Sequence, residues 1–200
     1  SRSVEFAKKF GVVFEVRSSL NDNPGTIVKE ETKSMEDIVI RGVSLDKNQA
    51  KVTLVAVPDK PGVAARIFKA IGDANVNVDM IVQNISHGAA SPTTDLSFTV
   101  DKPDLLKSQK VIDGLKKEVG FRQVIANEAI GKLSIVGVGM RSHSGVAARM
   151  FDTLAREGIN IDMISTSEIK VSVVLDLAKG EQAMRAVHAA FLQKLSGPAA

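Results

Sequence analysis

The sequence predicts an α+β protein built from two similar small domains, each with the element order βαββαβ. The first observation behind this prediction is a repeat: Gly62–Phe68 and Gly145–Phe151 differ at a single position. The second is the segment before each copy, a run of mainly apolar residues that opens with lysine, Lys51–Val57 and Lys132–Val138. Such repeats indicate the architecture before any other feature, because each copy is one structural unit.

A third observation extends the repeat. The phrase Asn-x-Asp-Met-Ile starts at Asn77 and again at Asn160, with valine or isoleucine at x. The residues of this phrase alternate between polar and apolar side chains, which is typical of a strand. Two copies are too few for a solenoid, so the repeat predicts two cores of the same kind.

Composition limits the classes of function. The 200 residues are 44% hydrophobic and include no cysteine, which allows sizeable cores and excludes disulfides and thiolate metal sites. Because His87, His143 and His188 lie far apart in the sequence, no metal site is predicted. The net charge is only +3 and Trp and Tyr are absent, which disfavours nucleic-acid binding. No stretch is long enough to span a membrane and no signal-peptide pattern is present, so we expect a cytoplasmic protein with no membrane partner.

The N-terminal segment predicts a short helix, Val4–Phe10, that ends at Gly11. Strands are predicted at Val12–Val16 and Thr26–Val28. One helix and two short strands cannot bury a core of their own. We therefore expect residues 1–34 to be the tail of a larger domain followed by a charged linker.

The first domain is predicted to cover residues 50–128. Pro61 suits the first turn of its first helix, Gly62 suits the turn before that helix, and Asp59 suits the capping position. The second helix is expected to turn four aliphatic residues to the core, Leu105, Leu106, Ile112 and Leu115. The expected elements are strand 51–57, helix 61–72, strand 76–85, strand 94–100, helix 103–118 and strand 121–126.

The second domain lacks a sixth strand, whereas an extra strand, Ile38–Val43, precedes the first domain. The simplest accounting gives the extra strand to the second domain. The first domain is then inserted into the second, which consists of residues 36–49 and 129–195, and short right-handed connections permit this. The other expected elements are strand 132–139, helix 144–157 capped by Ser142 or Ser144, strand 160–166, strand 170–175 and helix 181–195.

Three phrases carry a resemblance to a known family: Asp59–Ala64 (Asp-Lys-Pro-Gly-Val-Ala), Asn77–Gln83 (Asn-Val-Asp-Met-Ile-Val-Gln) and Asn160–Glu168 (Asn-Ile-Asp-Met-Ile-Ser-Thr-Ser-Glu). They resemble the regulatory region of aspartate kinase, a pair of ferredoxin-like ACT domains. The similarity covers about residues 35–195. Ahead of it, Val4–Gly11 with Val16–Ser19 is similar to the end of that family's amino-acid-kinase domain.

The resemblance implies a function. ACT domains of this family bind threonine, lysine or both, and the bound end product inhibits the kinase. We therefore expect a homodimeric regulatory part, which in some members of the family pairs with a full-length catalytic subunit. No catalytic residue is expected here, and ATP and magnesium belong to the catalytic domain. Lys9–Val12 is predicted to end a helix and not to bind phosphate. The alternatives are an ACT-domain sensor of another metabolic enzyme and a ferredoxin-like nucleic-acid module.

An amino-acid effector needs partners for its carboxylate and its ammonium group. Free N–H groups at a helix start favour a carboxylate. Gly62 permits close approach to the backbone, and Asp59 can pair with an ammonium group. The alternative is that Asp59 only caps the helix and Gly62 only makes the turn. Together with the resemblance, this chemistry predicts an effector site made of Asp59, Lys60, Pro61, Gly62, Val63, Ala64, Asn77, Val78, Asp79, Gln83, Val146, Ala147, Asn160, Ile161, Ser167 and Glu168.

Two further expectations concern how this site closes. Gln83 is expected to share a face of its strand with Asp79 and Ile81, from which it reaches the ligand. Asn160 and Ile161 are expected to close the site from the second domain.

The turn of the second copy differs from that of the first. Met140–Ser144 is longer and has no counterpart of Asp59. We therefore expect the second pocket either to bind another effector or to be degenerate.

Overall fold

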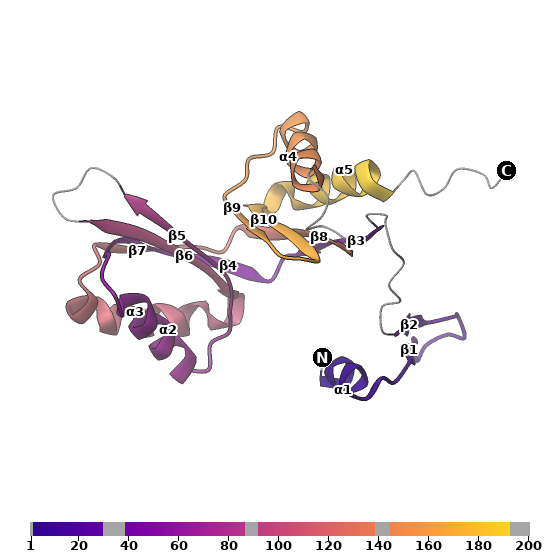
Figure 1. The fold of residues 1–200 in the computed structure, drawn as a ribbon, viewed down its shortest axis with the longest axis horizontal. Helices are drawn as coiled ribbons and strands as arrows, with labels where there is room; N and C mark the ends of the chain where they lie inside the picture. Colours follow the sequence, from indigo (N-terminus) through magenta and orange to yellow (C-terminus); the bar gives the residue numbers. More distant parts are fainter. Residues whose placement is uncertain (1, 30–38, 87–91, 139–144, 193–200) are drawn as a thin grey trace. The chain divides into compact units, whose positions relative to one another are not determined.

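The computed structural model describes residues 2–29, 39–86, 92–138 and 145–192 (Figure 1). The chain forms two compact units, Ser1–Asp37 and Ile38–Ala200.

The small unit has the elements that its sequence predicts. Helix α1 (Arg2–Phe10) precedes an antiparallel hairpin of β1 (Phe14–Val16) and β2 (Thr26–Val28). Among its described residues none is buried, and the stacked rings of Phe6 and Phe10 are exposed. This unit therefore has no core of its own. Its origin in a kinase domain stays a prediction.

The large unit contains two four-stranded antiparallel sheets. The first has the order β5-β6-β4-β7. Its elements are β4 (Gln49–Pro58), α2 (Val63–Asp73), β5 (Val78–Ser86), β6 (Thr93–Asp101), the 3-10 turn η1 (Lys102–Asp104), α3 (Leu105–Val119) and β7 (Gln123–Asn127).

The second sheet has the order β3-β8-β10-β9. Its elements are β3 (Val39–Asp46), β8 (Ile130–Val138), α4 (Val146–Arg156), β9 (Met163–Thr166), β10 (Lys170–Asp176), the 3-10 turn η2 (Leu177–Lys179) and α5 (Gly180–Leu192). In both sheets the strand that follows the first helix lies at one edge. The arrangement is that of two ferredoxin-like domains, as predicted.

Strand β3 belongs to the second sheet although it precedes the first domain in the sequence. It pairs with β8 along its length, for example Val43 with Ile135. Lys47, in the turn after β3, donates a hydrogen bond to Glu181 at the start of α5. That contact lowers the pKa of the Glu181 carboxyl group from its ordinary value. The predicted strand exchange is therefore confirmed, whereas the residue bounds of the two domains stay predictions.

Each sheet packs its own core under its own pair of helices (Figure 1). Repeated residues take equivalent places, because Ile67 in α2 and Met150 in α4 are both fully buried. The prediction for Leu106 was wrong: it is 69% exposed, while Leu105 is buried. The helix starts at Leu105 and not at 103, since Lys102–Asp104 form a 3-10 turn, and this changes which residue faces the sheet.

We expect Ile40→Ala to destabilise the protein by about 2–4 kcal/mol, because a large side chain that is 8% exposed leaves a cavity in the core of the second sheet. Urea unfolding followed by circular dichroism measures the change. Leu106→Ala, at an exposed position, is the control and should lie within about 0.5 kcal/mol of the parent. Equal effects of the two substitutions would contradict the assignment of β3.

Candidate functional site

The turn between β4 and α2 is held by backbone hydrogen bonds. Asp59 N–H donates to the Pro92 carbonyl at 3.0 Å, and Lys60 N–H donates to the Pro58 carbonyl at 3.0 Å. Gly62 follows with φ 91°, a left-handed conformation that glycine adopts at little cost. This conformation, not Pro61, sets the point where the helix begins.

The start of α2 corrects two predictions. The helix begins at Val63 with Gly62 as its N-cap, so Pro61 lies before the first turn and not within it. Among the described residues no side chain caps this helix, so Asp59 is not the predicted cap. The Val63 N–H donates to the Lys60 carbonyl at 3.3 Å, which leaves the N–H groups of Ala64 and Ala65 to receive an anionic group.

Gln83 lies on the face of the first sheet that the helices cover. Its cross-strand partner is Leu96, which is buried in the first core together with Ile67 of α2. Side chains of directly paired residues point to the same face. Gln83 is nevertheless exposed, because β5 is the edge strand.

Ala64 in α2 and Gln83 in β5 lie at the same level along the strands of the first sheet. The ring of Phe68 in α2 meets the ring of Phe98 edge-on, with centroids 5.5 Å apart. Ala64 comes one helical turn before Phe68, about 6 Å. Leu96, the partner of Gln83, comes two residues before Phe98, about 6.6 Å. Helix α2 and strand β6 both start at the end of the sheet where Pro58 pairs with Thr93. The step from Ala64 to Phe68 is therefore parallel to the step from Leu96 to Phe98. We call Asp59–Ala64 with Gln83 the first site.

Asp79 does not share the face of Gln83, contrary to the prediction. The register of β5 against β6 shifts between Val78 and Ile81, and the Met80 N–H donates to the buried Thr99 hydroxyl at 3.2 Å. This bulge breaks the two-residue alternation. The Asp79 carboxylate instead accepts from Lys132 of the second domain.

The second domain repeats this geometry in part. Gly145, with φ 122°, precedes α4; Val146 is buried and Ala147 is half-buried. Thr166 takes the place of Gln83, and its strand partner, Val171, lies in the second core. We call Gly145–Ala147 with Thr166 the second site. The predicted turn Met140–Ser144, with its capping serines, lies outside the described residues.

Asn160 and Ile161 do not close the first site within one chain. Ile161 packs against the second core, and β9 begins only at Met163. The neighbouring Asp162 pairs with Lys51 at the start of β4 at 3.2 Å. The first site lies at the other end of β4, about 20 Å away at the usual rise of a strand.

The other predicted residues lie in turns and at strand starts. Asn77 is exposed, and Val78 packs on the first core. Ser167 closes the turn between β9 and β10, since its N–H donates to the Lys170 carbonyl at 2.8 Å. Glu168 is exposed in the same turn.

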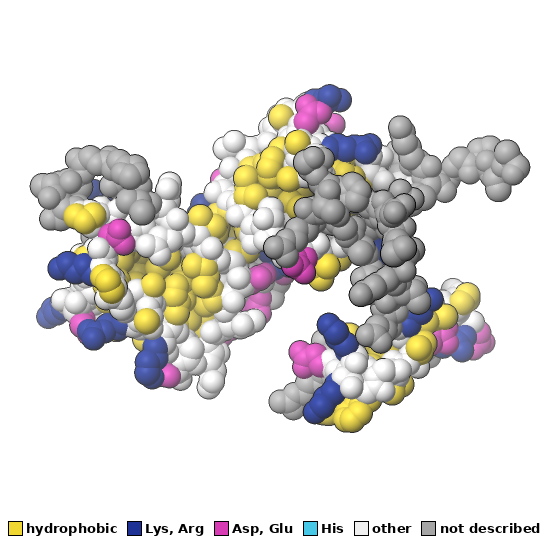
Figure 2. Space-filling view, in the orientation of Figure 1, with side chains coloured by type: hydrophobic (Ala, Val, Ile, Leu, Met, Phe, Trp, Pro, Cys, Tyr) yellow, Lys and Arg dark blue, Asp and Glu magenta, His cyan; other side chains and the backbone are white. Residues whose placement is uncertain are grey.

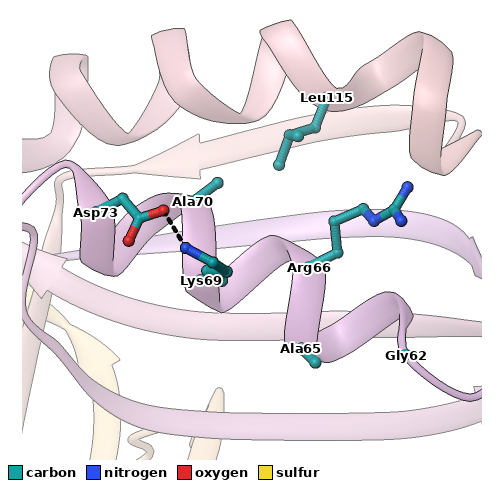
Figure 3. A pocket seen from close by; sticks show the side chains of 7 residues that line it. All are labelled: Gly62, Ala65, Arg66, Lys69, Ala70, Asp73 and Leu115. Atoms are coloured by element: carbon teal, nitrogen blue, oxygen red, sulfur yellow. Dashed lines mark hydrogen bonds and ion pairs between the residues drawn. The ribbon is translucent and has the colours of Figure 1, made fainter.

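A separate groove lies between α2 and α3 (Figure 3). Its volume is about 370 Å³, and it is lined by Gly62, Ala65, Arg66, Lys69, Ala70, Asp73 and Leu115. Lys69 and Asp73, one turn apart on α2, form an ion pair of 2.6 Å along that side of the groove. This groove shares Gly62 with the first site, but its other lining residues lie outside that site, and neither Ala64 nor Gln83 lines it.

Sequence analysis missed two lysines. Lys51 and Lys132 each pair with an aspartate of the other domain. A signal was present, because each lysine opens the mainly apolar run that precedes a repeated phrase. Elsewhere, no helix in the described ranges is long and apolar enough to cross a membrane, and within those ranges no three acidic or histidine side chains gather to hold a metal ion.

Comparisons with known sequences agree with this fold. A family model described as the ACT domain matches residues 52–114 and 133–191. Aspartate kinase of Pseudomonas fluorescens SBW25 is 49% identical over 199 residues, which are 99% of this chain and 47% of that protein. Aspartokinase of Mycolicibacterium smegmatis is 46% identical over 192 residues, 95% of this chain and 45% of that protein. The chain thus spans about half the length of the curated relatives it matches.

Solved structures give the same result. One chain in the structure of aspartokinase alpha and beta subunits is 49% identical to this chain, with a TM-score of 0.71. The match covers 76% of this chain and 99% of that one. The regulatory subunit of aspartate kinase from Thermus thermophilus, in its ligand-free form, is 38% identical, with a TM-score of 0.71 over 76% of this chain and 98% of that subunit. Aspartate kinase from Synechocystis is 37% identical, with a TM-score of 0.75 over all of this chain and 32% of that one.

Two ferredoxin-like domains with matched ACT sequences define a tandem ACT-domain protein. The family within that class follows from the relatives. The chain belongs to the aspartate kinase family, and its ACT domains are those of the allosteric regulatory part. The expected fold class and family are confirmed.

We expect Gly62→Ala to destabilise the protein by about 1–2 kcal/mol, because alanine adopts a φ of 91° only with strain. Gly72→Ala is the matched control. Gly72 is helical and an added Cβ meets open space, so the protein should gain up to about 1 kcal/mol. Urea unfolding distinguishes the two, and stabilisation by Gly62→Ala would show that the turn has another conformation.

Proposed function

We propose that this chain is a cytoplasmic regulatory part of aspartate kinase that binds threonine, lysine or both. Binding inhibits the kinase, so that these end products of aspartate-family biosynthesis regulate their own formation. The chain itself carries no catalytic residue in this proposal. The ATP and magnesium sites belong to a catalytic domain, either in a longer form of this chain or in a full-length partner subunit.

One observation supports the amino-acid site most directly: the start of α2 and the exposed Gln83 lie on the same face of the first sheet, at the same level along it. The N–H groups of the first turn of α2 suit the carboxylate of the ligand. The exposed Asp59 carboxylate can pair with the ammonium group. Gln83 offers both a donor and an acceptor to a hydroxyl group or a longer side chain.

A second copy of the chain completes the site in this proposal. Asn160 and Ile161 lie at the far end of the first sheet within their own chain, so they reach the first site only from a partner. Large apolar side chains remain exposed on the sheets, as at Ile81, Ile125 and Ile164, and Figure 2 shows hydrophobic groups at the surface over the sheets. Open sheet edges favour pairing with another copy.

We expect Ala64→Thr and Gln83→Ala each to weaken threonine binding by about 1–3 kcal/mol, or roughly 5- to 150-fold, because one fills the site and the other removes a polar contact. Folding should change little, since neither replaced side chain is fully buried. Isothermal titration calorimetry with threonine and lysine, alone and together, measures the effect.

The control is Gln123→Ala, which removes an exposed glutamine from the opposite face of the same sheet. It should leave binding unchanged. If both site variants titrate like the parent, the ligand binds elsewhere.

We expect sedimentation to give a homodimer at micromolar concentration. The shared site can be tested by complementation, since Gln83→Ala and Asn160→Ala each impair one side of it. In an equal mixture half of the dimers are mixed, and each mixed dimer has one intact site of two. About a quarter of all sites should therefore regain parental affinity. No recovery in a mixture that exchanges subunits would contradict a site shared between copies.

A further inference from the structure

Strand β5 presents its two faces to different parts of the molecule. On one face, Ile81 and Gln83 pair with the core residues Phe98 and Leu96 beside α2. On the other face, Met80 and the neighbouring Val82 belong to a separate apolar cluster. The remaining members of that cluster come from the second domain: Ile130, Met163 and Val174. A ligand at the first site therefore touches a strand whose reverse side is the contact between the domains.

The contact between the domains is reciprocal. Lys51 of the first domain pairs with Asp162 of the second at 3.2 Å, and Lys132 of the second pairs with Asp79 of the first. These four residues hold equivalent places in the repeat, because each lysine is the third residue of its strand and each aspartate belongs to an Asn-x-Asp-Met-Ile phrase. The repeated residues thus bind across the domains and make the contact nearly two-fold symmetric.

The two halves of this contact differ in strength. Lys132 lies 3.7 Å from Asp46 as well as contacting Asp79, and its side chain is 11% exposed. Among the described residues Lys51 pairs with a single aspartate, and its side chain is 22% exposed. A cation that is more buried and has two carboxylate partners is held more firmly than a cation with one.

The neighbours of the two lysines increase this difference. Val174 is the strand partner of Lys132, whereas the equivalent partner of Lys51 is Thr99. Ile130 precedes Lys132 by two residues, whereas Gln49 precedes Lys51. Apolar packing therefore supports the Lys132 half, and polar groups surround the Lys51 half.

We propose that this reciprocal contact couples ligand binding at the first site to the stability of the second domain. The Lys132–Asp79 pair, the anchor, stays formed, and the Lys51–Asp162 pair, the yielding contact, changes when the ligand binds. The ligand part of this inference rests on the proposed function. Strand β5 is the link, since it carries Gln83 on one face and Asp79 and Met80 toward the other domain. Lys51 and Lys132 act through the contact and are positioning residues.

The first experiment needs no ligand. Hydrogen exchange monitored by mass spectrometry compares the buried strands of the two domains in the parent and in Lys132→Met. In the parent, the strands of the two domains should open in one event and show similar protection factors. In Lys132→Met, the protection factors of the two domains should differ by about tenfold. Lys69→Met, which breaks the exposed ion pair on α2, is the control and should leave them together.

Charge reversal tests the predicted asymmetry. Lys51→Asp with Asp162→Lys restores one pair of opposite charges, so the double variant should recover the joint opening that each single variant weakens. Lys132→Asp with Asp79→Lys should not recover it, because the new aspartate would face Asp46. Equal recovery at both pairs would overturn the distinction between anchor and yielding contact.

The second experiment adds threonine or lysine. In the parent, the ligand should raise protection in α2 and β5 and also in β8 and β10 of the second domain. Lys51→Met should keep the affinity within about twofold and lose the rise in the second domain. An unchanged rise in Lys51→Met would overturn the proposal. If the parent binds neither amino acid, the proposed function fails, while the ligand-free experiment still decides whether the contact joins the domains.

Discussion

The pairing of β3 with β8 is the constraint on which the large unit depends. The second sheet has only three strands in the sequence that follows the first domain, and β3 supplies the fourth from the other side of that domain. The chain must therefore pass between the sheets twice. The two passages lie side by side, because Asp46 pairs with Lys132 at their ends in the second sheet and Lys51 pairs with Asn127 at their ends in the first. This double connection keeps the two domains close enough for a lysine of each domain to pair with an aspartate of the other.

Much of the fold follows from the sequence because it rests on repetition and periodicity. The copies at Gly62 and Gly145 place the same helix over the same kind of sheet, and Ile67 and Met150 fill equivalent places in the two cores. The insertion of one domain into the other followed from counting strands. Local periodicity was less informative at Leu106, where a 3-10 turn changed the start of the helix and so its buried face.

The candidate site was less predictable, since its details depend on contacts between segments far apart in the sequence. Alternation assigned Asp79 to the face of Gln83, but a bulge in β5 turned it toward Lys132. That bulge is stabilised by the hydroxyl group of Thr99, which lies 19 residues beyond Met80 in the sequence. Likewise, a cap at Asp59 was chemically reasonable, and only the backbone conformation of Gly62 excludes it.

The same bulge relates local irregularity to function. A regular β5 would alternate strictly, so Asp79, Ile81 and Gln83 would all face α2 and no aspartate of this strand would reach the second domain. One extra residue separates the strand into a part that joins the domains and a part that faces the first site. The irregular segment coincides with the repeated Asn-x-Asp-Met-Ile phrase, and its equivalent in the second domain supplies Asp162. In both copies the aspartate of the phrase binds a lysine of the other domain, so the phrase serves the contact between the domains as well as its own strand.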